Sequence, residues 1–250
     1  KMNKISNKKI YGVVICYNSE SAIEDLYKRI DKEIFDKIYF FDDNSTDNSY
    51  EIAKTFDWQV IKNQTNLGHG GNLKKAIKTA FMDGADYVLE IHADNQYDPN
   101  FISKAKNFIE QDYALITGSR FVNKNPYKEE GMPFLRYFSN KVMSNFTKKL
   151  LSIQLTEFHT GFKIFGKNFY NKVPFENCSN NYLFSFQIIL ATKFFNLKYG
   201  EISISADYGD KVNSCNYYNG FIYLMSNFVE IFYYLLAKSK IFTKAIYKSK

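Results

Sequence analysis

The sequence is poor in cysteine and proline, and its first residues lack a long hydrophobic run. Of 250 residues, three are Cys and four are Pro. Cys16, Cys178 and Cys215 are odd in number and far apart, which argues against a disulfide framework and against a zinc site built from cysteine pairs. Isolated cysteines fit a reducing compartment. The Lys- and Asn-rich first residues contain no apolar segment of the kind found in signal peptides, so we expect no signal peptide there.

Acidic residues are fewer than basic ones, but the excess is modest. The chain has 33 Lys and Arg against 26 Asp and Glu, a net charge of +7. A basic balance suits nucleic acid, an anionic membrane surface or a phosphorylated substrate. No basic recognition helix, RGG-like tract or zinc-ligand set is evident, so we expect no nucleic-acid partner. The length and the 45% hydrophobic content allow a sizeable core.

Short apolar runs alternate with helical patterns over the first 110 residues. We expect strands at 9–16, 37–41, 59–62 and 85–90, followed by helices at 21–30, 50–56, 73–82 and 100–110. This alternation predicts parallel βαβ units. Later we expect strands at 115–118 and 197–205, a loop entering a strand at 157–165, helices at 134–151, 182–195 and 221–238, and loops at 123–132 and 207–218. The predicted fold class is α/β, a mostly parallel central sheet flanked by helices, with an amphipathic C-terminal helix.

Polar side chains follow the fourth predicted strand. Asp94 and Gln96 lie just beyond it, in a loop that the next helix closes. Ligands of open α/β sheets bind outside the carboxyl ends of the strands. An oxygen-donating pair at i and i+2 suits a hard divalent cation that keeps its other positions for phosphate oxygens and water. We therefore expect Mg²⁺ or Mn²⁺ at this pair.

A glycine-rich segment, residues 66–72, precedes the helix at 73–82. Glycines in such a loop let the backbone approach a ligand closely, and a helix that follows them can bind phosphate. The same glycines would equally allow a tight turn and close packing. The sequence leaves both interpretations open.

The motifs, taken in order, resemble a known family. They are CYN at 16–18, FDDNSTD at 41–47, NLG at 66–68, ADNQYDP at 93–99, GSR at 118–120 and HTGF at 159–162. The set is similar to the family 2 glycosyltransferases of the GT-A fold, in particular the dolichyl- and polyprenyl-phosphate sugar transferase branch. The resemblance implies the GT-A fold, a UDP- or GDP-linked sugar donor, a divalent cation and inversion at the anomeric carbon.

The resemblance also assigns donor-binding residues. They are Tyr17, Asn18, Asp42, Asp43, Gly68, His92, Asp94 and Arg120, with Asp94 and Gln96 on the metal. His92 stands where the family usually has the first acid of Asp-x-Asp, so it either weakens metal binding, contacts the donor or is a hydrogen-bonded residue at the strand end. Asp42 and Asp43 could instead cap a helix, because acidic side chains favour helix N-termini, although we expect Asp47 and Ser45 to do so.

The acceptor side is assigned in the same way. Arg120 and Arg136 match phosphate-binding arginines, a role that suits the bidentate guanidinium, although a surface salt bridge is the alternative. Glu157 matches an acid that either acts as base for a hydroxyl acceptor or orients a phosphate acceptor. Expected catalytic residues are Asp94, Glu157 and Arg120, and expected acceptor-binding residues are Arg136, His159 and Lys211.

Residues 221–236 form an aromatic, apolar segment of about sixteen residues, interrupted by Ser226, Asn227 and Glu230. That is shorter than the ~20 residues needed to span a bilayer. With the basic residues that follow, the pattern is typical of an interfacial helix at anionic headgroups, or of a core helix that closes the sheet. We expect the chain in the cytoplasm, either free or peripheral at the inner face of the membrane.

One domain, 1–250, is expected, with a nucleotide-sugar half at 9–122, an acceptor half at 123–215, and a C-terminal helix and basic tail at 217–250. The predicted function is inverting sugar transfer from a nucleoside-diphosphate sugar to a polyprenyl-phosphate acceptor. The alternatives are a saccharide hydroxyl acceptor and a non-catalytic nucleotide-binding protein. A sugar-1-phosphate nucleotidyltransferase would need a Gly-rich, basic segment after the first strand, and residues 17–20 are not one. The sequence does not fix the sugar, the base or the oligomeric state.

Overall fold

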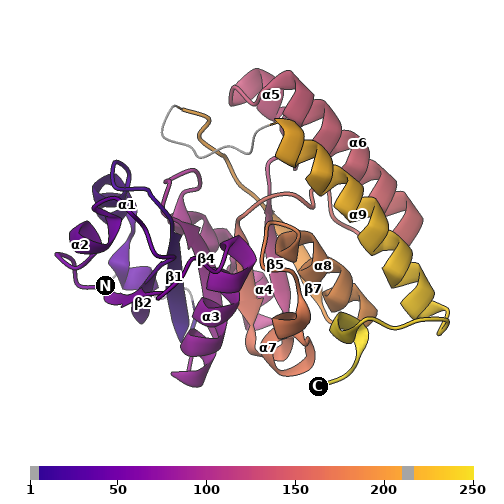
Figure 1. The fold of residues 1–250 in the computed structure, drawn as a ribbon, viewed down its shortest axis with the longest axis horizontal. Helices are drawn as coiled ribbons and strands as arrows, with labels where there is room; N and C mark the ends of the chain where they lie inside the picture. Colours follow the sequence, from indigo (N-terminus) through magenta and orange to yellow (C-terminus); the bar gives the residue numbers. More distant parts are fainter. Residues whose placement is uncertain (1–5, 210–216) are drawn as a thin grey trace.

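A computed structural model describes residues 6–209 and 217–250 (Figure 1). Within them, one sheet has the strand order β3-β2-β1-β4-β6-β5-β7. The strands are β1 Ile10–Cys16, β2 Lys37–Asp42, β3 Gln59–Lys62, β4 Tyr87–His92, β5 Leu115–Ser119, β6 Lys163–Gly166 and β7 Tyr199–Ser203. Every pair is parallel except those of β6, which runs antiparallel to both β4 and β5. The predicted α/β fold class, with a mostly parallel sheet, is confirmed.

Helices cover both faces of this sheet. They are α1 Ile23–Arg29, α2 Ser49–Ala53, α3 His69–Met82, α4 Lys106–Glu110, α5 Pro126–Glu129, α6 Phe134–Leu151, α7 Lys167–Lys172, α8 Phe184–Phe194 and α9 Tyr217–Lys238, with a 3-10 helix at Pro99–Ala105. One core contains Leu26 of α1 and Ile109 of α4, and the other contains Ala76 of α3 and Ile188 of α8. Burial from both sides explains why the central strands have continuous apolar sequences instead of alternating ones.

Helix α3 begins four residues earlier than the sequence predicts. The backbone N–H groups of Gly70 and Gly71 donate to the carbonyl oxygen of Asn180, at 2.8 and 3.2 Å. A Cβ atom on Gly70 would lie 2.4 Å from the carbonyl oxygen of Ser179, so only glycine permits this approach. The predicted loop is therefore helical in its second half. The two glycine amides bind the carbonyl oxygen of Asn180, so they are not free to bind a phosphate.

Strand β4 ends two residues later than expected. It pairs with β1 in a register that reaches Ile15 opposite His92. Asp94 and Gln96 then fall in the turn that follows, where Asn95 has a left-handed φ of 61° that Asn tolerates. His92 is thus a strand residue, whereas Asp94 and Gln96 lie in a loop as predicted.

The long helices α6 and α9 lie side by side at one end of the molecule (Figure 1). The rings of Phe146 and Phe228 meet between them, with centroids 5.4 Å apart. The apolar part of α9 extends over Gly220–Lys238, 19 residues with a mean hydropathy of 1.4, so by length and composition alone it could cross a membrane. This corrects the shorter segment expected from the sequence. The predicted loop at 123–132 also contains a short helix, α5.

Core packing gives a first prediction. Phe165 of β6 is fully buried, whereas Phe134 at the start of α6 is 60% exposed. Phe165→Ala should lower the free energy of unfolding by about 3–5 kcal/mol, because the substitution removes buried area and leaves a cavity. The same substitution at Phe134 should change it by no more than about 0.5 kcal/mol. Urea denaturation followed by circular dichroism measures both, and equal losses would contradict the packing described here.

Candidate functional site at the carboxyl ends of the strands

The loops that follow β1 and β2 are joined by hydrogen bonds. The backbone N–H of Asn18 donates to Ser45 Oγ at 2.9 Å, and Asn18 Oδ1 accepts from the backbone N–H of Thr46 at 2.9 Å. Glu20 accepts from the backbone N–H of Asn48 at 2.8 Å. Asn18 is held with a left-handed φ of 50°. Tyr17 is half-exposed beside this junction, so its ring is open to a ligand.

The two acids at the end of β2 have different surroundings. Asp43 accepts from Asn63 Nδ2 (2.8 Å) and from the backbone N–H groups of Leu67 (2.8 Å) and Gly68 (2.9 Å). It therefore fixes the Asn-Leu-Gly loop. Asp42 is fully buried, and its Oδ1 has no hydrogen-bond partner among the described residues.

Helix capping near this loop belongs to another acid. Asp47 Oδ1 accepts from the backbone N–H of Ser49, the first residue of α2, at 3.0 Å. The capping that the sequence allowed for Asp42 and Asp43 is thus done by Asp47. Asp42 Oδ2 accepts from the backbone N–H of Ser45 at 3.0 Å, so both acids at the end of β2 hold neighbouring loops in place.

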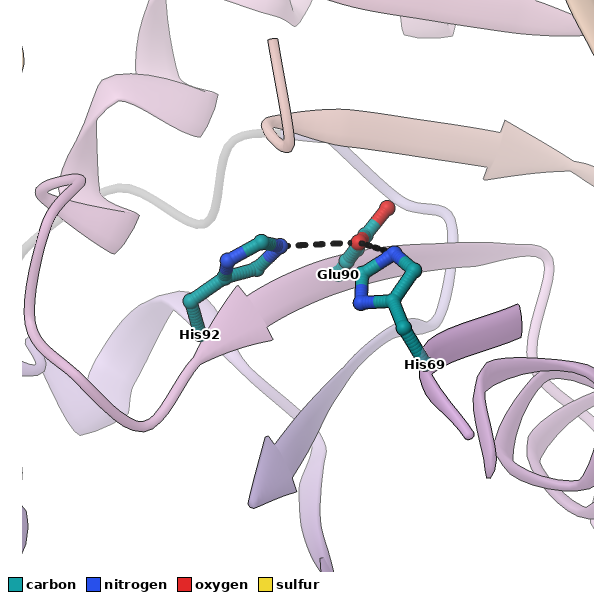
Figure 2. Close-up of side chains that lie close together, drawn as sticks. All are labelled: His69, Glu90 and His92. Atoms are coloured by element: carbon teal, nitrogen blue, oxygen red, sulfur yellow. Dashed lines mark hydrogen bonds and ion pairs between the residues drawn. The ribbon is translucent and has the colours of Figure 1, made fainter. Parts of the chain in front are cut away.

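Two histidines converge on a buried acid beside β4 (Figure 2). Glu90 and His92 are alternate residues of the strand, so their side chains share one face of the sheet. His92 Nε2 lies 2.9 Å from Glu90 Oε1, and Nε2 of His69, the first residue of α3, lies 3.5 Å from the same oxygen. Burial would lower the pKa of His92, but the hydrogen bond to Glu90 and its charge raise it overall. Burial lowers the pKa of His69 to about 4.

A glycine brings the next loop against this cluster. A Cβ atom on Gly161 would lie 2.3 Å from Cε1 of His92. The HTGF segment can therefore reach β4 only because residue 161 has no side chain. The histidine on β4 and the loop that contains His159 thus lie in contact.

The Asp94–Gln96 turn borders a surface pocket. Asp94 Oδ1 accepts from the backbone N–H of Gln96 at 3.1 Å. Gln96 lines a cavity of about 320 Å³ together with Arg29, Asp98, Glu130 and Asp207. The carboxylate and the amide are both partly exposed, so their oxygens can reach a ligand.

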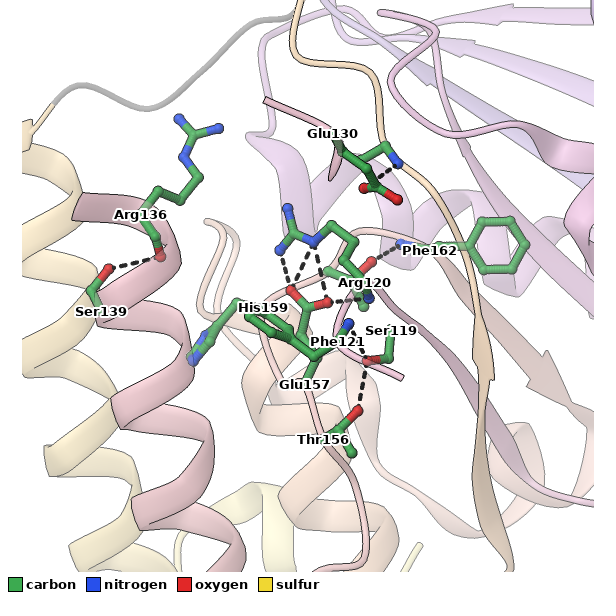
Figure 3. Close-up of polar contacts among 12 residues, drawn as sticks. Ser119, Arg120, Phe121, Glu130, Arg136, Ser139, Thr156, Glu157, His159 and Phe162 are labelled. Atoms are coloured by element: carbon green, nitrogen blue, oxygen red, sulfur yellow. Dashed lines mark hydrogen bonds and ion pairs between the residues drawn. The ribbon is translucent and has the colours of Figure 1, made fainter. Parts of the chain in front are cut away.

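Arg120 and Glu157 form a buried ion pair (Figure 3). Their side chains are 3% and 0% exposed. Arg120 Nε donates to both carboxylate oxygens, at 2.9 and 3.1 Å, Nη2 donates to Oε1, and the Arg120 backbone N–H donates to Oε2 at 2.7 Å. Arg120 Nη1 donates to the Tyr208 hydroxyl at 2.9 Å. The sequence predicts that Arg120 contacts phosphate and that Glu157 is either a base or a group that orients the acceptor. In this structure the two side chains bind each other, and both roles stay predictions.

The remaining acceptor-side residues are dispersed. His159 Nδ1 lies 3.1 Å from the Tyr223 hydroxyl of α9, and its buried Nε2 has no partner among the described residues. Burial lowers the pKa of His159 to about 3, and the charges of Arg120 and Lys163 act in the same direction, so the ring is neutral. Arg136 lies on the first turn of α6, apart from the ion pair (Figure 3). Lys211 lies outside the described residues.

Two polar residues of this region, His69 and Glu90, were missed from the sequence, and they lie near the buried Lys163. Lys163 Nζ donates to the carbonyl oxygen of Thr160, and burial lowers its pKa to about 8. An acid and a histidine at alternate positions of an apolar strand, Glu90 and His92, were the available signal, since they must share one face of the sheet.

Comparison with known proteins adds the family. The profile described as "Glycosyl transferase family 2" matches residues 12–177, in agreement with the resemblance found in the motifs. An uncharacterized protein of Methanocaldococcus jannaschii is 29% identical over 209 residues, which are 83% of this chain and 85% of that protein. The UDP-N-acetylglucosamine–dolichyl-phosphate N-acetylglucosaminyltransferase of Methanococcus voltae is 26% identical over 222 residues, 82% of this chain and 88% of that enzyme.

Solved structures share the fold. Glucosyl-3-phosphoglycerate synthase from Mycobacterium tuberculosis, in complex with Mn²⁺, UDP and glucosyl-3-phosphoglycerate, superposes with a TM-score of 0.68 at 13% identity. The match covers 94% of this chain and 81% of that one. The same enzyme in complex with UDP alone gives a TM-score of 0.65 at 15% identity and covers 98% of this chain and 87% of that one.

The buried ion pair yields a prediction that separates structural from catalytic roles. Glu157→Ala leaves the Arg120 guanidinium buried without its counter-charge, so the free energy of unfolding should fall by about 3–5 kcal/mol. The double variant Arg120→Met/Glu157→Leu removes both charges and should be far closer to wild type. Chemical denaturation of Arg120→Met, Glu157→Leu and the double variant gives the coupling energy. Additive losses would show that the two side chains do not depend on each other.

Proposed function

This chain belongs to glycosyl transferase family 2, and on that premise we propose that it transfers a sugar, with inversion, from a nucleoside-diphosphate sugar to a polyprenyl-phosphate acceptor. The relative from Methanococcus voltae, whose name specifies dolichyl phosphate as acceptor, covers most of both chains and supports this acceptor class. UDP in the complexes of the solved neighbour favours a UDP-linked donor, and GDP remains the alternative.

The donor would lie over the carboxyl ends of β1, β2 and β4. The half-exposed ring of Tyr17 is available to the base, and Asn18 is fixed beside it by Ser45. Asp43 would act through the loop it holds, which presents Gly68 at the edge of the site. Asp42, whose unpaired Oδ1 is buried, would lie beneath this site and would contact a nucleoside only after the loop beyond β2 moves. His92 borders the same site from β4.

The donor set of Asp94 and Gln96 fits a hard divalent cation, because both side chains supply oxygen and both are partly exposed. When bound, such an ion offsets the negative charge that builds on the departing diphosphate. Mn²⁺ and Mg²⁺ in complexes of the solved neighbour agree with this choice. The hydrogen bond from the Gln96 backbone to Asp94 keeps the carboxylate in the turn and orients its free oxygen.

The observation that carries the choice of acceptor is the engagement of Glu157 by Arg120. A sugar hydroxyl is barely ionised at neutral pH and needs a base within hydrogen-bond reach. Here the expected base is buried and accepts four hydrogen bonds from Arg120. A lipid phosphate is already an anion and can attack without a base. The geometry therefore favours a phosphate acceptor over a saccharide hydroxyl.

In this mechanism the ion pair positions the loop, and other groups meet the acceptor. Arg136, on α6, is the cation we assign to the acceptor phosphate, since a guanidinium binds phosphate oxygens through a bidentate fork. His159 is neutral and tethered to Tyr223, so it would help to orient the acceptor without transferring a proton. Lys211 is a further candidate contact.

Sugar transfer with a labelled nucleotide sugar tests the proposal. With Mn²⁺ present, label from a UDP-sugar should enter an organic phase with polyprenyl phosphate and should not be transferred to free oligosaccharides. Asp94→Asn should reduce turnover by at least about 100-fold, because the cation that would offset the charge of the leaving diphosphate loses its carboxylate ligand. Arg136→Ala should raise the KM for the lipid phosphate more than the KM for the donor.

Stability controls decide how a loss is interpreted. The thermal midpoint of Asp94→Asn should match wild type, since Asp94 is only partly buried. Efficient transfer to a saccharide, with polyprenyl phosphate inert, would replace the acceptor we propose. Binding of nucleotides without turnover on any acceptor would favour the non-catalytic alternative.

A further inference from the structure

The exposed apolar surface of the protein is concentrated on two helices. Of nineteen large hydrophobic side chains that the described residues expose, fifteen lie on α6, on α9 or directly after α9. On α6 they form a stripe spaced four residues apart, at Phe138, Val142, Phe146 and Leu150. On α9 they recur at helical spacing from Phe221 to Leu235. We call these exposed side chains of the two helices the α6/α9 face. A contiguous apolar patch of this extent marks an interaction site.

Two polar residues of α9 point away from this face. Asn227 and Glu230 are 0% and 1% exposed. Glu230 accepts from Gln187 Nε2 of α8 at 2.9 Å and from Lys244 Nζ at 2.8 Å. Two of the residues that interrupt the apolar run in the sequence therefore face the protein. Ser226 lies partly exposed on the outer side, where its hydroxyl donates to the carbonyl oxygen of Ile222, and the other exposed side chains from Phe221 to Leu235 are apolar. A helix that packs its polar side on α8 is suited to lie along a surface, not to cross a bilayer alone.

The basic excess of the chain is located in the same segments. Helix α6 contains four basic residues and no acidic one. From the start of α9 to residue 250 there are five Lys and a single acid, the buried Glu230. These two segments carry a net charge of +8, which is the whole positive excess of a chain whose total is +7. Positive charge beside an apolar, aromatic helix face complements the anionic headgroups of a membrane.

We propose that the α6/α9 face docks on an anionic lipid bilayer, with both helices lying in the interfacial plane. At 1.5 Å per residue, α6 and α9 are about 27 and 33 Å long, so together they form a broad platform. Rings such as Phe138 and Phe232 would enter the boundary between headgroups and acyl chains, and Lys141 and Lys149 at the sides would meet the phosphates. The proposed docking is argued from the exposed apolar side chains and the basic residues of these helices. It does not depend on the identity of the acceptor.

Vesicle binding in the absence of donor and acceptor tests the docking. The full chain should co-sediment with vesicles of phosphatidylcholine and phosphatidylglycerol, and binding to phosphatidylcholine alone should be at least about tenfold weaker. Phe138→Asp/Phe232→Asp should reduce partitioning into the anionic vesicles by at least about tenfold, because two rings that the bilayer would bury are replaced by charges. Met82→Asp is the matched control. Met82 is 72% exposed on α3, outside the face, and its variant should bind like wild type.

Other occupants of the face would give different results. If light scattering shows a dimer that the double variant splits, and wild type ignores vesicles, the face joins two copies of the chain and the proposal is wrong. Protein that alkaline carbonate cannot extract from vesicles would mean insertion across the bilayer, which also overturns it. The substituted side chains are exposed, so an unchanged circular dichroism spectrum should accompany the loss of binding.

A second inference rests on the cluster of His69, Glu90 and His92 (Figure 2). One donor atom from each residue lies within 4.8 Å of the others, and the two imidazole rings are 5.5 Å apart at 62°. The Glu90 side chain is fully buried, and its Oε2 has no hydrogen-bond partner among the described residues. A buried carboxylate oxygen without a partner is costly, which points to a missing ligand.

We infer that these three residues bind a transition-metal ion such as Zn²⁺. Two imidazole nitrogens and one carboxylate are a donor set that zinc takes in open sites, at about 2.0–2.2 Å from each ligand. Two ligands at those distances from one ion are at most about 4.4 Å apart. The three donor atoms here lie within 4.8 Å of one another, so they are close to the spacing that a shared ion requires. Nitrogen donors distinguish this site from the oxygen pair Asp94 and Gln96, which suits Mg²⁺ or Mn²⁺. The buried ammonium group of Lys163 also interacts with the charge of Glu90, so it would compete with a metal ion for this carboxylate.

Zinc titration against a chromogenic chelator tests this site by binding alone. The metal-free protein should take up one equivalent, and His69→Ala should lower the affinity by at least about 100-fold, because one of three ligands is lost. Glu90→Gln, which keeps the shape of the side chain, should do the same. Asp94→Ala should leave zinc binding unchanged, since Asp94 belongs to the other donor set. Wild-type protein without zinc affinity, or equal affinity in all variants, would overturn the assignment.

Discussion

The buried ion pair between Arg120 and Glu157 is the constraint on which the loop before β6 depends. Removing both charges from water costs several kcal/mol per ion, and only good geometry with further hydrogen bonds offsets that cost. Here four hydrogen bonds join the guanidinium and backbone of Arg120 to the carboxylate. The pair fixes the loop before β6 to the end of β5. His159 and Gly161, two and four residues beyond Glu157, take their places against Tyr223 of α9 and His92 of β4.

The parallel core was predictable because its information is local. Each apolar run ends in turn-forming or capping residues and is followed by a helical period, and right-handed crossovers leave few arrangements for such units. The motif residues follow the carboxyl ends of parallel strands, so they can be assigned to one edge of the sheet even when their contacts are unknown. This is why Tyr17, Asp43 and Asp94 could be placed in one region from the sequence, although their individual partners could not.

The features that sequence reasoning missed depend on contacts between distant residues. The helical start of α3 requires the carbonyl of Asn180, which is more than a hundred positions away. The direction of β6 follows from its insertion between β4 and β5, which a four-residue strand does not reveal. Glu157 has the side chain of a base, and only the fold shows that Arg120 occupies it. A residue type indicates what a group can do, whereas its partners decide which of those roles is open.

Helix α9 joins the chemistry of the site to the outer surface. Its Tyr223 contacts His159 in the acceptor loop, while Phe221 and Ile222 of the same turn are exposed. A substrate whose phosphate reaches the loop and whose hydrocarbon chain lies along the apolar helices would satisfy both surfaces at once. A soluble saccharide would use only the loop and would make no contact with the apolar helices. The polar site and the apolar surface on one helix therefore agree with the lipid-linked phosphate that we propose as acceptor.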